Sequence, residues 1–194
     1  MERSFIEVYN FLRGYDLLKD TPFYWWPNAL SFEVVVGAIL TQNTSWSNVE
    51  RSLDNLQGYL SLERFVVLEE EDLKQRIRPS GFYNQKAPRL LTLAKNIQSE
   101  FGSFENFQKN VTRGWLLAQR GIGKESADAI LCYGCGKEVM VIDSYTKRVL
   151  ERFGIVFCGY DGYKSYIEHS VEQNWEIFAK DYQEDRHLFF CHLQ

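Results

Sequence analysis

Apolar residues recur at intervals of three and four along most of the chain, which is the spacing of one face of an α-helix. This pattern predicts an amphipathic helix over residues 5–12 and a long helix over 84–100. The run 32–40 is apolar at nearly every position and predicts a buried central helix. The only β-like run is the short segment 139–142. Further helices are expected over 49–56, 69–78, 104–109, 112–118, 124–136, 144–153 and 161–180. The sequence therefore predicts an all-α protein.

Composition places the chain among ordinary soluble globular proteins, because 45% of its 194 residues are hydrophobic and 25% are charged. The net charge of −4 does not by itself indicate a nucleic-acid binder, so any DNA contact must depend on local charge. No apolar run reaches the roughly 18 residues that a membrane span needs, and the N-terminus lacks the apolar core of a signal peptide. A cytoplasmic protein is expected.

Two of the four cysteines, Cys132 and Cys135, form a Cys-x-x-Cys pair that a metal or redox site can use. They fall inside a predicted helix, where a spacing of three places them on one face. No second close pair follows. Buried, reduced thiols are the favoured interpretation, and a metal or redox site is the alternative.

The most informative segment runs from Trp115 to Ile130, where two helical patterns are joined by a turn that contains Gly121 and Gly123. Glycine at such a turn allows unusual backbone angles and leaves amide N–H groups bare at the start of the second helix. With Lys124 beside it, this helix start suits a DNA phosphate. The alternative is a plain tight turn between two helices.

The run 121–127, followed by Asp143 within 141–145, resembles the helix-hairpin-helix plus aspartate signature of the endonuclease III superfamily (HhH-GPD). The resemblance covers roughly residues 28–155. It implies that Asp143 is the catalytic carboxylate. It also implies that the hairpin grips the DNA backbone through four residues: Gly121, Gly123, Lys124 and Ser126.

Three further segments resemble the same superfamily, and one of them, residues 113–115, opens the first helix of the hairpin. Residues 40–44 match the loop whose glutamine, here Gln42, fills the gap left by a flipped base, and residues 79–87 match the start of the long helix. Two departures matter. Glu125 stands where lyase members carry a Schiff-base lysine, and near the C-terminus only Cys191 matches the cysteines of the iron–sulfur members. The resemblance therefore implies a glycosylase without AP-lyase activity, without an iron–sulfur cluster and without a metal.

Four consecutive aromatic residues precede Pro27, among them Trp25 and Trp26. They form either a hydrophobic plug in the core or, together with Pro27 and Trp46, a slot in which a flipped base stacks. A cationic alkylated purine would be attracted to such ring faces. The segment 25–30 resembles that of bacterial 3-methyladenine DNA glycosylases, which implies an alkylated adenine as substrate.

Asp143 lies where the apolar run 139–142 meets the next helix. An aspartate there can cap the helix, and its second oxygen can stabilise a cationic sugar and aim a water at it. N-methylation already makes adenine a good leaving group, so no strong general acid is needed. The two roles are compatible.

A local excess of positive charge lies within residues 74–95, which contain no acidic residue. These side chains either follow DNA phosphates or form a solvated helix face. We expect Lys86 to contact the DNA backbone. The six residues are Lys74, Arg76, Arg78, Lys86, Arg89 and Lys95.

We therefore expect two all-α lobes with an active-site cleft between them. The central lobe is 28–136, with the hairpin at about 112–136, and the second, discontinuous lobe is 1–27 with 137–194. The expected activity is hydrolysis of alkylated purines, chiefly 3-methyladenine, from double-stranded DNA by a monomer on the bacterial nucleoid. The alternatives are a glycosylase for other damaged or mismatched bases and a non-catalytic DNA-binding module.

Overall fold

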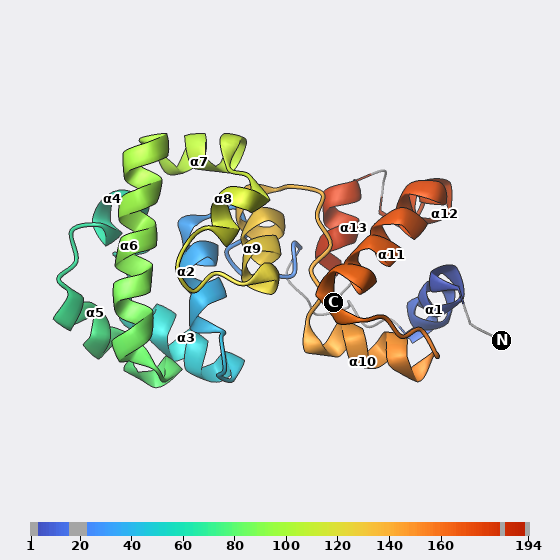
Figure 1. Cartoon of the computed structure of the whole chain (residues 1–194), viewed down its shortest axis with the longest axis horizontal. Helices are drawn as coiled ribbons and strands as arrows, with labels where there is room; N and C mark the ends of the chain where they lie inside the picture. The colour runs from blue at the N-terminus through green and yellow to red at the C-terminus, as the bar shows by residue number, and fades with distance from the viewer. Residues whose placement is uncertain (1–3, 16–22, 183–184, 193–194) are drawn as a thin grey trace. The chain divides into compact units, whose positions relative to one another are not determined.

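The computed structural model describes residues 4–15, 23–182 and 185–192. The chain divides into two compact units (Figure 1). We call residues 28–136 the central unit and residues 1–27 with 137–194 the split unit. Helices make up the regular structure, and no strand occurs in the described ranges. The all-α fold class is therefore confirmed.

The central unit contains eight α-helices and two shorter helical turns among its residues. They are α2 (Phe32–Leu40), α3 (Trp46–Asn55), α4 (Leu62–Phe65), α5 (Glu70–Arg76), η2 (Arg78–Ser80), α6 (Tyr83–Phe101), α7 (Phe104–Asn110), α8 (Arg113–Leu117), α9 (Lys124–Ala129) and η3 (Ile130–Gly134).

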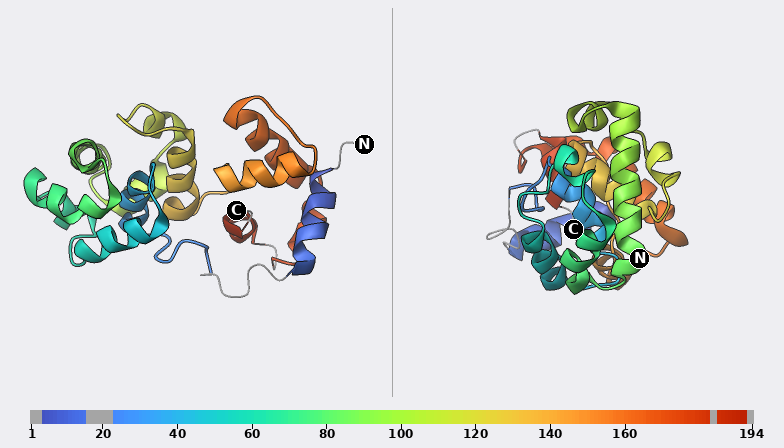
Figure 2. Two further views of the ribbon diagram at one scale, coloured as in Figure 1. Left: turned by 90° about the horizontal axis from the view of Figure 1, so that it is seen from below. Right: turned by 90° about the vertical axis from the view of Figure 1, so that its left-hand side faces the viewer.

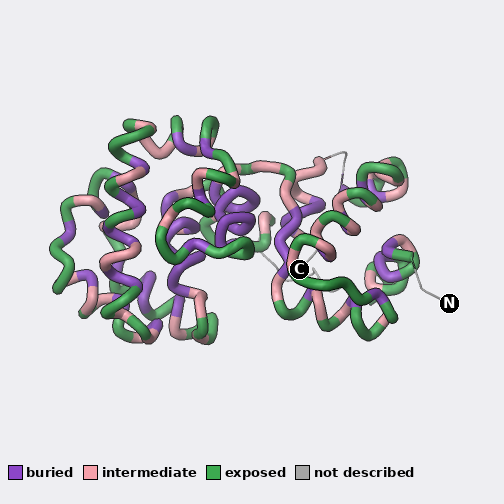
Figure 3. The backbone as a smooth tube through the Cα atoms, in the orientation of Figure 1, coloured by how far each residue is buried: buried purple, intermediate pink, exposed green. Residues whose placement is uncertain are grey.

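Helix α2 forms the core of the central unit. All of its residues except Glu33 are buried, as Figure 3 shows along its length. Glu33 accepts a hydrogen bond from the Asn28 side chain (2.9 Å), so the single polar residue of the helix is satisfied near its start. The continuous apolar run in the sequence thus correctly predicted a helix enclosed by its neighbours.

Helix α6 is the longest element, with 19 residues, and is seen end on in the left-hand view of Figure 2. Its buried residues recur on one face and include Leu90, Ala94 and Ile97. Pro88 lies in the second turn, where it removes one backbone donor without ending the helix. The helix ends at Gly102, whose φ of +75° suits glycine.

The split unit begins with α1 (Phe5–Leu12) and the short turn η1 (Arg13–Tyr15), and resumes after residue 136. Ser4 and Glu7 form a capping box that fixes the start of α1. The remaining helices are α10 (Ser144–Arg152), α11 (Gly159–Gln173), α12 (Trp175–Ala179) and α13 (Arg186–His192).

Aromatic rings fill the core of the split unit. Phe178 lies at its centre, with ring centroids 4.8 Å from both Tyr9 and Phe189 and 6.0 Å from Phe5. Tyr182 packs edge-on against Phe189 at 5.1 Å. These contacts attach α1 to helices that follow it by more than 160 residues. A large part of the aromatic content thus serves packing.

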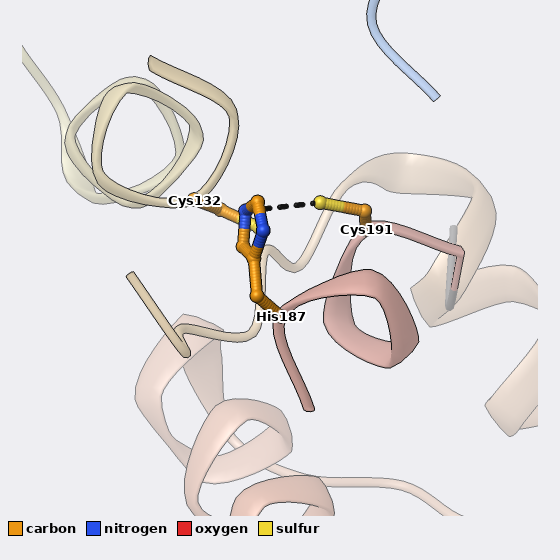
Figure 4. A group of neighbouring side chains, drawn as sticks. All are labelled: Cys132, His187 and Cys191. Atoms are coloured by element: carbon orange, nitrogen blue, oxygen red, sulfur yellow. Dashed lines mark hydrogen bonds between the residues drawn. The ribbon is translucent and has the colours of Figure 1, made fainter. Parts of the chain in front are cut away.

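Helix α13 carries His187 and Cys191 one turn apart, and their side chains are hydrogen-bonded at 3.3 Å (Figure 4). The ring of Tyr24 packs against His187, with centroids 5.1 Å apart. All four cysteines are thiols. Cys132, which Figure 4 also labels, belongs to the central unit and is buried there, whereas Cys135 is half-buried.

The structure corrects two predicted helices. The helix expected over 161–180 is broken at Asn174, whose side chain donates to the carbonyl oxygen of Ser170 (2.9 Å) and so ends α11. The helix expected over 124–136 changes at Ile130 into a wider π-helical turn, η3, which shifts the spacing that would have placed Cys132 and Cys135 on one helical face.

None of the described helices combines the length and the apolar character needed to cross a membrane.

Candidate functional site

Helices α8 and α9 form a helical hairpin in the central unit, joined by residues 118–123. Thr112 caps α8 by accepting a hydrogen bond from the Trp115 backbone N–H (3.2 Å). The two helices are held together by Arg113 and Asp128, which form a two-pronged ion pair with N–O distances of 2.8 and 3.0 Å. The Asp128 side chain is fully buried, so this pair fixes the helices within the core.

The two glycines of the hairpin differ in backbone conformation and in the space around them. Gly121 adopts a φ of +84°, and a Cβ atom there would lie 2.6 Å from Cδ of Arg89. Gly123 is the N-cap of α9 with an ordinary extended conformation (φ −91°), and a Cβ there would meet nothing within 4 Å. Of the two glycines, only Gly121 uses the unusual backbone angles that glycine allows.

Gln42 lies against the hairpin. Its side-chain amide donates hydrogen bonds to the carbonyl oxygen of Gly121 and to the hydroxyl oxygen of Ser126, both at 3.0 Å. The hydroxyl of Ser126 in turn donates to the Ala38 carbonyl oxygen (3.4 Å). The amide nitrogen of Gln42 is thus engaged within the central unit, and its role in filling a gap in DNA stays a prediction.

Ser126 is buried, with 9% of its surface exposed, and its hydroxyl is engaged inside the unit. Any contact of Ser126 with a phosphate would therefore be made by its backbone N–H. Lys124, the first residue of α9, is exposed. The hairpin thus presents Gly121, Gly123 and Lys124 at its surface.

The expected contact of Lys86 with the DNA backbone stays a prediction, because the structure shows only that its side chain is buried, with 2% exposure. Its ammonium donates to the carbonyl oxygens of Leu40 (2.9 Å) and Ser80 (2.8 Å). Burial lowers the pKa of Lys86 to about 8. Because Leu40 ends α2 and Ser80 ends η2, Lys86 holds together the starts of two loops.

Three loops are thus brought together in the central unit, and we call residues 41–45, 81–82 and 118–123 the three-loop cluster. Lys86 joins the first to the second, and Gln42 joins the first to the third. Phe82 in the second loop has φ +47° and is 60% exposed, and Asn43 in the first has φ +55° and is exposed. Neither residue stands out in the sequence, because no pattern of residue types marks an exposed residue in the left-handed conformation.

Only part of the basic stretch 74–95 is available to a ligand. Lys74 pairs with Glu70 (2.8 Å) and Arg76 pairs with Asp72 (2.9 Å), so the acidic start of α5 neutralises them. Lys86 is buried. The local charge of the surface is therefore smaller than the six basic residues indicated.

In the split unit, the extended run 139–142 that leads to Asp143 has no strand partner among the described residues. Side chains of α11 hold its backbone instead. Met140 N–H donates to Glu168 (3.0 Å), Lys164 donates to the Met140 carbonyl oxygen (3.1 Å), and Ile142 N–H donates to the Tyr160 hydroxyl (3.2 Å). The three α11 residues are spaced by four, so one helix face fixes the backbone that positions Asp143.

Asp143 is the N-cap of α10 and is partly exposed. Its Oδ1 accepts hydrogen bonds from the backbone N–H (2.7 Å) and the hydroxyl (2.9 Å) of Thr146. Its Oδ2 has no hydrogen-bond or ion-pair partner in the part of the chain that the structure describes. One oxygen therefore fixes the carboxylate, and the other is available to a reacting group.

The residues expected to form a base slot are divided between the units. Trp26 is buried, Trp25 is 37% exposed with φ +64°, and Pro27 is exposed, all in the split unit. The segment is tied to α13, because His192 Nε2 donates to the Phe23 carbonyl oxygen (2.8 Å). Trp46 begins α3 in the central unit and is 39% exposed. The base slot stays a prediction.

Residues 36–175 match the model of the HhH-GPD superfamily base excision DNA repair proteins. This match includes α2 from residue 36 onward, the hairpin, Asp143 and all of α11. The chain belongs to this superfamily. Within it, the chain is a DNA glycosylase of base excision repair.

Individual relatives agree with this assignment. A Methanocaldococcus jannaschii protein, whose name describes it as a DNA repair glycosylase, is 44% identical over 165 residues, which cover 80% of this chain and 75% of that protein. The crystal structure of the H. pylori 3-methyladenine DNA glycosylase MagIII, bound to 1,N6-ethenoadenine, is 44% identical with a TM-score of 0.93, covering 98% of this chain and 94% of that one. An endonuclease III trapped on DNA is 18% identical, with a TM-score of 0.72 over 98% of this chain and 86% of that one, and supports the fold alone.

Proposed function

We propose that this DNA glycosylase hydrolyses the N-glycosidic bond of alkylated purines in double-stranded DNA, chiefly 3-methyladenine. The observation that carries this proposal is the 44% identity over nearly the whole chain with a 3-methyladenine DNA glycosylase. Methylation at N3 gives the purine a positive charge, so the base leaves as a neutral molecule and needs little help from an acid.

Asp143 supplies the chemistry that remains. As the glycosidic bond breaks, positive charge develops on the sugar, and a fixed carboxylate stabilises it and orients the attacking water. The two hydrogen bonds from Thr146 hold Oδ1, which leaves Oδ2 for the sugar or the water. The carboxylate is thus already oriented before the substrate binds, as electrostatic stabilisation requires.

The absence of AP-lyase activity is part of the proposal. By resemblance, Glu125 occupies the position at which lyase members of the superfamily carry a Schiff-base lysine. A carboxylate cannot form a Schiff base. Lys124 is one residue earlier on α9, and one helical residue rotates a side chain by about 100°.

Base recognition is proposed for Trp25, Trp26, Pro27 and Trp46, whose rings would stack on a cationic purine. DNA is proposed to lie on the three-loop cluster, with Gly121, Gly123 and Lys124 at a phosphate and Gln42 in the gap left by the flipped base. The exposed Phe82 provides an apolar side chain of the kind that enters between stacked bases.

We also propose that the enzyme works as a monomer on nucleoid DNA, without a metal or an iron–sulfur cluster. Absorbance near 400 nm and metal analysis of the purified protein test the cofactor part, and sedimentation tests the oligomeric state. A stoichiometric iron content would contradict this part alone.

Substitution Asp143→Asn tests the catalytic assignment. Asparagine is as good an N-cap as aspartate, so α10 keeps its cap while the negative charge is lost. We expect release of 3-methyladenine from methylated duplex DNA to fall by roughly 100-fold or more, with DNA affinity retained. The matched control is Asp54→Asn on the exposed face of α3, which should leave base release unchanged.

Unchanged base release by Asp143→Asn would mean that Asp143 only caps α10. A panel of duplexes containing 3-methyladenine, 7-methylguanine, uracil, a G·T mismatch or 8-oxoguanine tests the substrate. Release of uracil or thymine without methyladenine would overturn the substrate class. A covalent adduct trapped by borohydride would overturn the absence of lyase activity.

A further inference from the structure

A polar hollow of about 420 Å³ lies in the central unit, on the N-terminal half of α6 beside the loop that joins α8 and α9. Figure 1 shows this loop reaching toward α6. The Arg89–Gly121 contact brings the two segments together. The residues that line the hollow are Asn84, Gln85, Pro88, Arg89, Thr92 and Arg120.

The two arginines give the hollow its charge. The Arg89 side chain lies directly over Gly121, and its Nη2 reaches Oε1 of Gln85 (3.4 Å), so its guanidinium is held at the hairpin loop. Arg120 is exposed, and its side chain has no hydrogen bond or ion pair within the described ranges. No carboxylate lines the hollow. Two positive charges therefore converge without a compensating acid.

The rest of the lining selects among ligands. The Asn84 and Gln85 amides and the Thr92 hydroxyl are hydrogen-bond donors, and no aromatic ring is present on which a base could stack. A hollow with two guanidinium groups and several neutral donors suits an oxyanion with several acceptor oxygens. The ligand class is therefore a phosphate group.

Position identifies the source of the phosphate. Arg89 lies against Gly121, and the Gly121 carbonyl oxygen accepts a hydrogen bond from Gln42. The hollow is thus continuous with the three-loop cluster, on which the proposed function places DNA. We propose that the Arg89–Arg120 hollow binds a phosphodiester group of the DNA backbone, in addition to the phosphate at the hairpin.

This inference relies on the DNA binding of the proposed function, but it is tested without base release. Thr92 is exposed in the middle of α6, so Thr92→Glu places a carboxylate in the hollow, and Thr92→Gln provides the neutral variant of equal size. Gln98→Glu adds the same charge to an exposed position nearer the end of the helix. Affinity for undamaged duplex is measured by fluorescence anisotropy between 50 and 200 mM salt.

We expect Thr92→Glu to weaken binding about tenfold at the lowest salt, with Thr92→Gln and Gln98→Glu within about twofold of the parent. Arg120→Gln should make the slope of log affinity against log salt less steep by about 0.9, the value for one phosphate contact. Equal affinities for all four variants, with unchanged slopes, would overturn the inference. If the parent enzyme released no base from damaged DNA, the proposed function would be overturned instead.

A free phosphate ion offers the same chemistry, so a second measurement separates the two sources. The Arg120 side-chain N–H resonance should shift with micromolar duplex DNA, and with inorganic phosphate only at millimolar concentration, because a single ion lacks the neighbouring contacts of the strand. Saturation by micromolar phosphate, without competition from DNA, would assign the hollow to a free ion and overturn the inference.

Discussion

At the scale of single residues, Lys86 and Asp143 illustrate how local partners decide a role. Both are charged residues at the ends of helical elements. Lys86 is enclosed and donates to two carbonyl oxygens, so its charge serves the fold. Asp143 uses one oxygen for the cap of α10 and keeps the other available. The catalytic role is therefore proposed for Asp143, whose second carboxylate oxygen still has hydrogen-bonding capacity.

The lowered pKa of Lys86 predicts a pH-dependent stability. The folded protein releases this proton near pH 8, whereas the unfolded chain keeps it to about pH 10.5. Between these values the unfolded state binds more protons, so the free energy of unfolding should rise with pH by at most about 1.4 kcal/mol per unit. A neutral amine still has two N–H groups, enough for Leu40 and Ser80.

Urea unfolding at pH 8, 9 and 10 measures this effect. The reference is Lys86→Met, because methionine at position 86 does not titrate. The window ends near pH 10, because burial raises the pKa of Tyr182 to about 12 and its unfolded-state ionisation then opposes folding. Parallel pH profiles for the parent and Lys86→Met would show that Lys86 keeps an ordinary pKa.

Residue types explain which of these roles the sequence could predict. Asp143 combined a favoured cap type with the superfamily resemblance, and the cap is observed. The burial of Lys86 was missed, because a lysine in a helix is normally solvated. Its partners, Leu40 and Ser80, lie at two helix ends far apart in the sequence, and apolar periodicity does not predict a contact between such ends.

At the scale of elements, length and polarity decided which helices could be predicted. The range of α2 followed from a continuous apolar run, and that of α6 from regular apolar periodicity. Helix α4 has only four residues, too few for a period to be visible, and α13 contains the apolar run 189–191 without regular polar spacing. The break at Asn174 depends on a side-chain bond to Ser170, which competes with the helix and leaves no sign in the apolar pattern.

The hairpin glycines provide a matched pair of substitutions. Gly121→Ala should lower the free energy of unfolding by about 1–3 kcal/mol, because alanine at φ +84° is strained and its Cβ would collide with Arg89. Gly123→Ala should change it by less than about 1 kcal/mol, because the backbone is ordinary and the space is open.

DNA binding should be affected at Gly123, the glycine whose substitution costs little stability. A Cβ at Gly123 would enter open space at the start of α9, where the proposed function places a phosphate, so Gly123→Ala should weaken DNA binding several-fold while the protein remains folded. Urea unfolding and anisotropy on the same samples measure both effects. A Gly121→Ala variant as stable as the parent would contradict the assigned strain.

At the scale of the whole molecule, the two units have different kinds of core. The central unit is built around the aliphatic helix α2, whereas the split unit is built around Phe178 and its neighbouring rings. The sequence indicated the aliphatic core through one apolar run. The expected second lobe already joined residues 1–27 to 137–194, but the apolar pattern did not show which rings attach α1 to α12 and α13. Four consecutive aromatic residues stand out in the sequence, but the rings that form this core are scattered along it.

The aromatic core of the split unit predicts where destabilisation will be felt. Phe178→Ala removes the ring that contacts Phe5, Tyr9 and Phe189 and should reduce the stability of the split unit by about 3–5 kcal/mol. Amide hydrogen exchange should then accelerate in α1, α12 and α13 together, although α1 is remote in sequence. Exchange in α2 and α6 should change little, because their buried residues belong to the central unit.

Phe107→Ala provides the matched control, because Phe107 is a fully buried ring of the central unit, on α7. It should accelerate exchange in the central unit and spare α1. If Phe178→Ala accelerated exchange in α12 and α13 but left α1 protected, the first helix would be held by something other than this core. The split unit would then not be a single cooperative structure. Joint loss of protection in α1, α12 and α13 would instead show that these helices unfold together around Phe178, as one cooperative part of the unit that also contains Asp143.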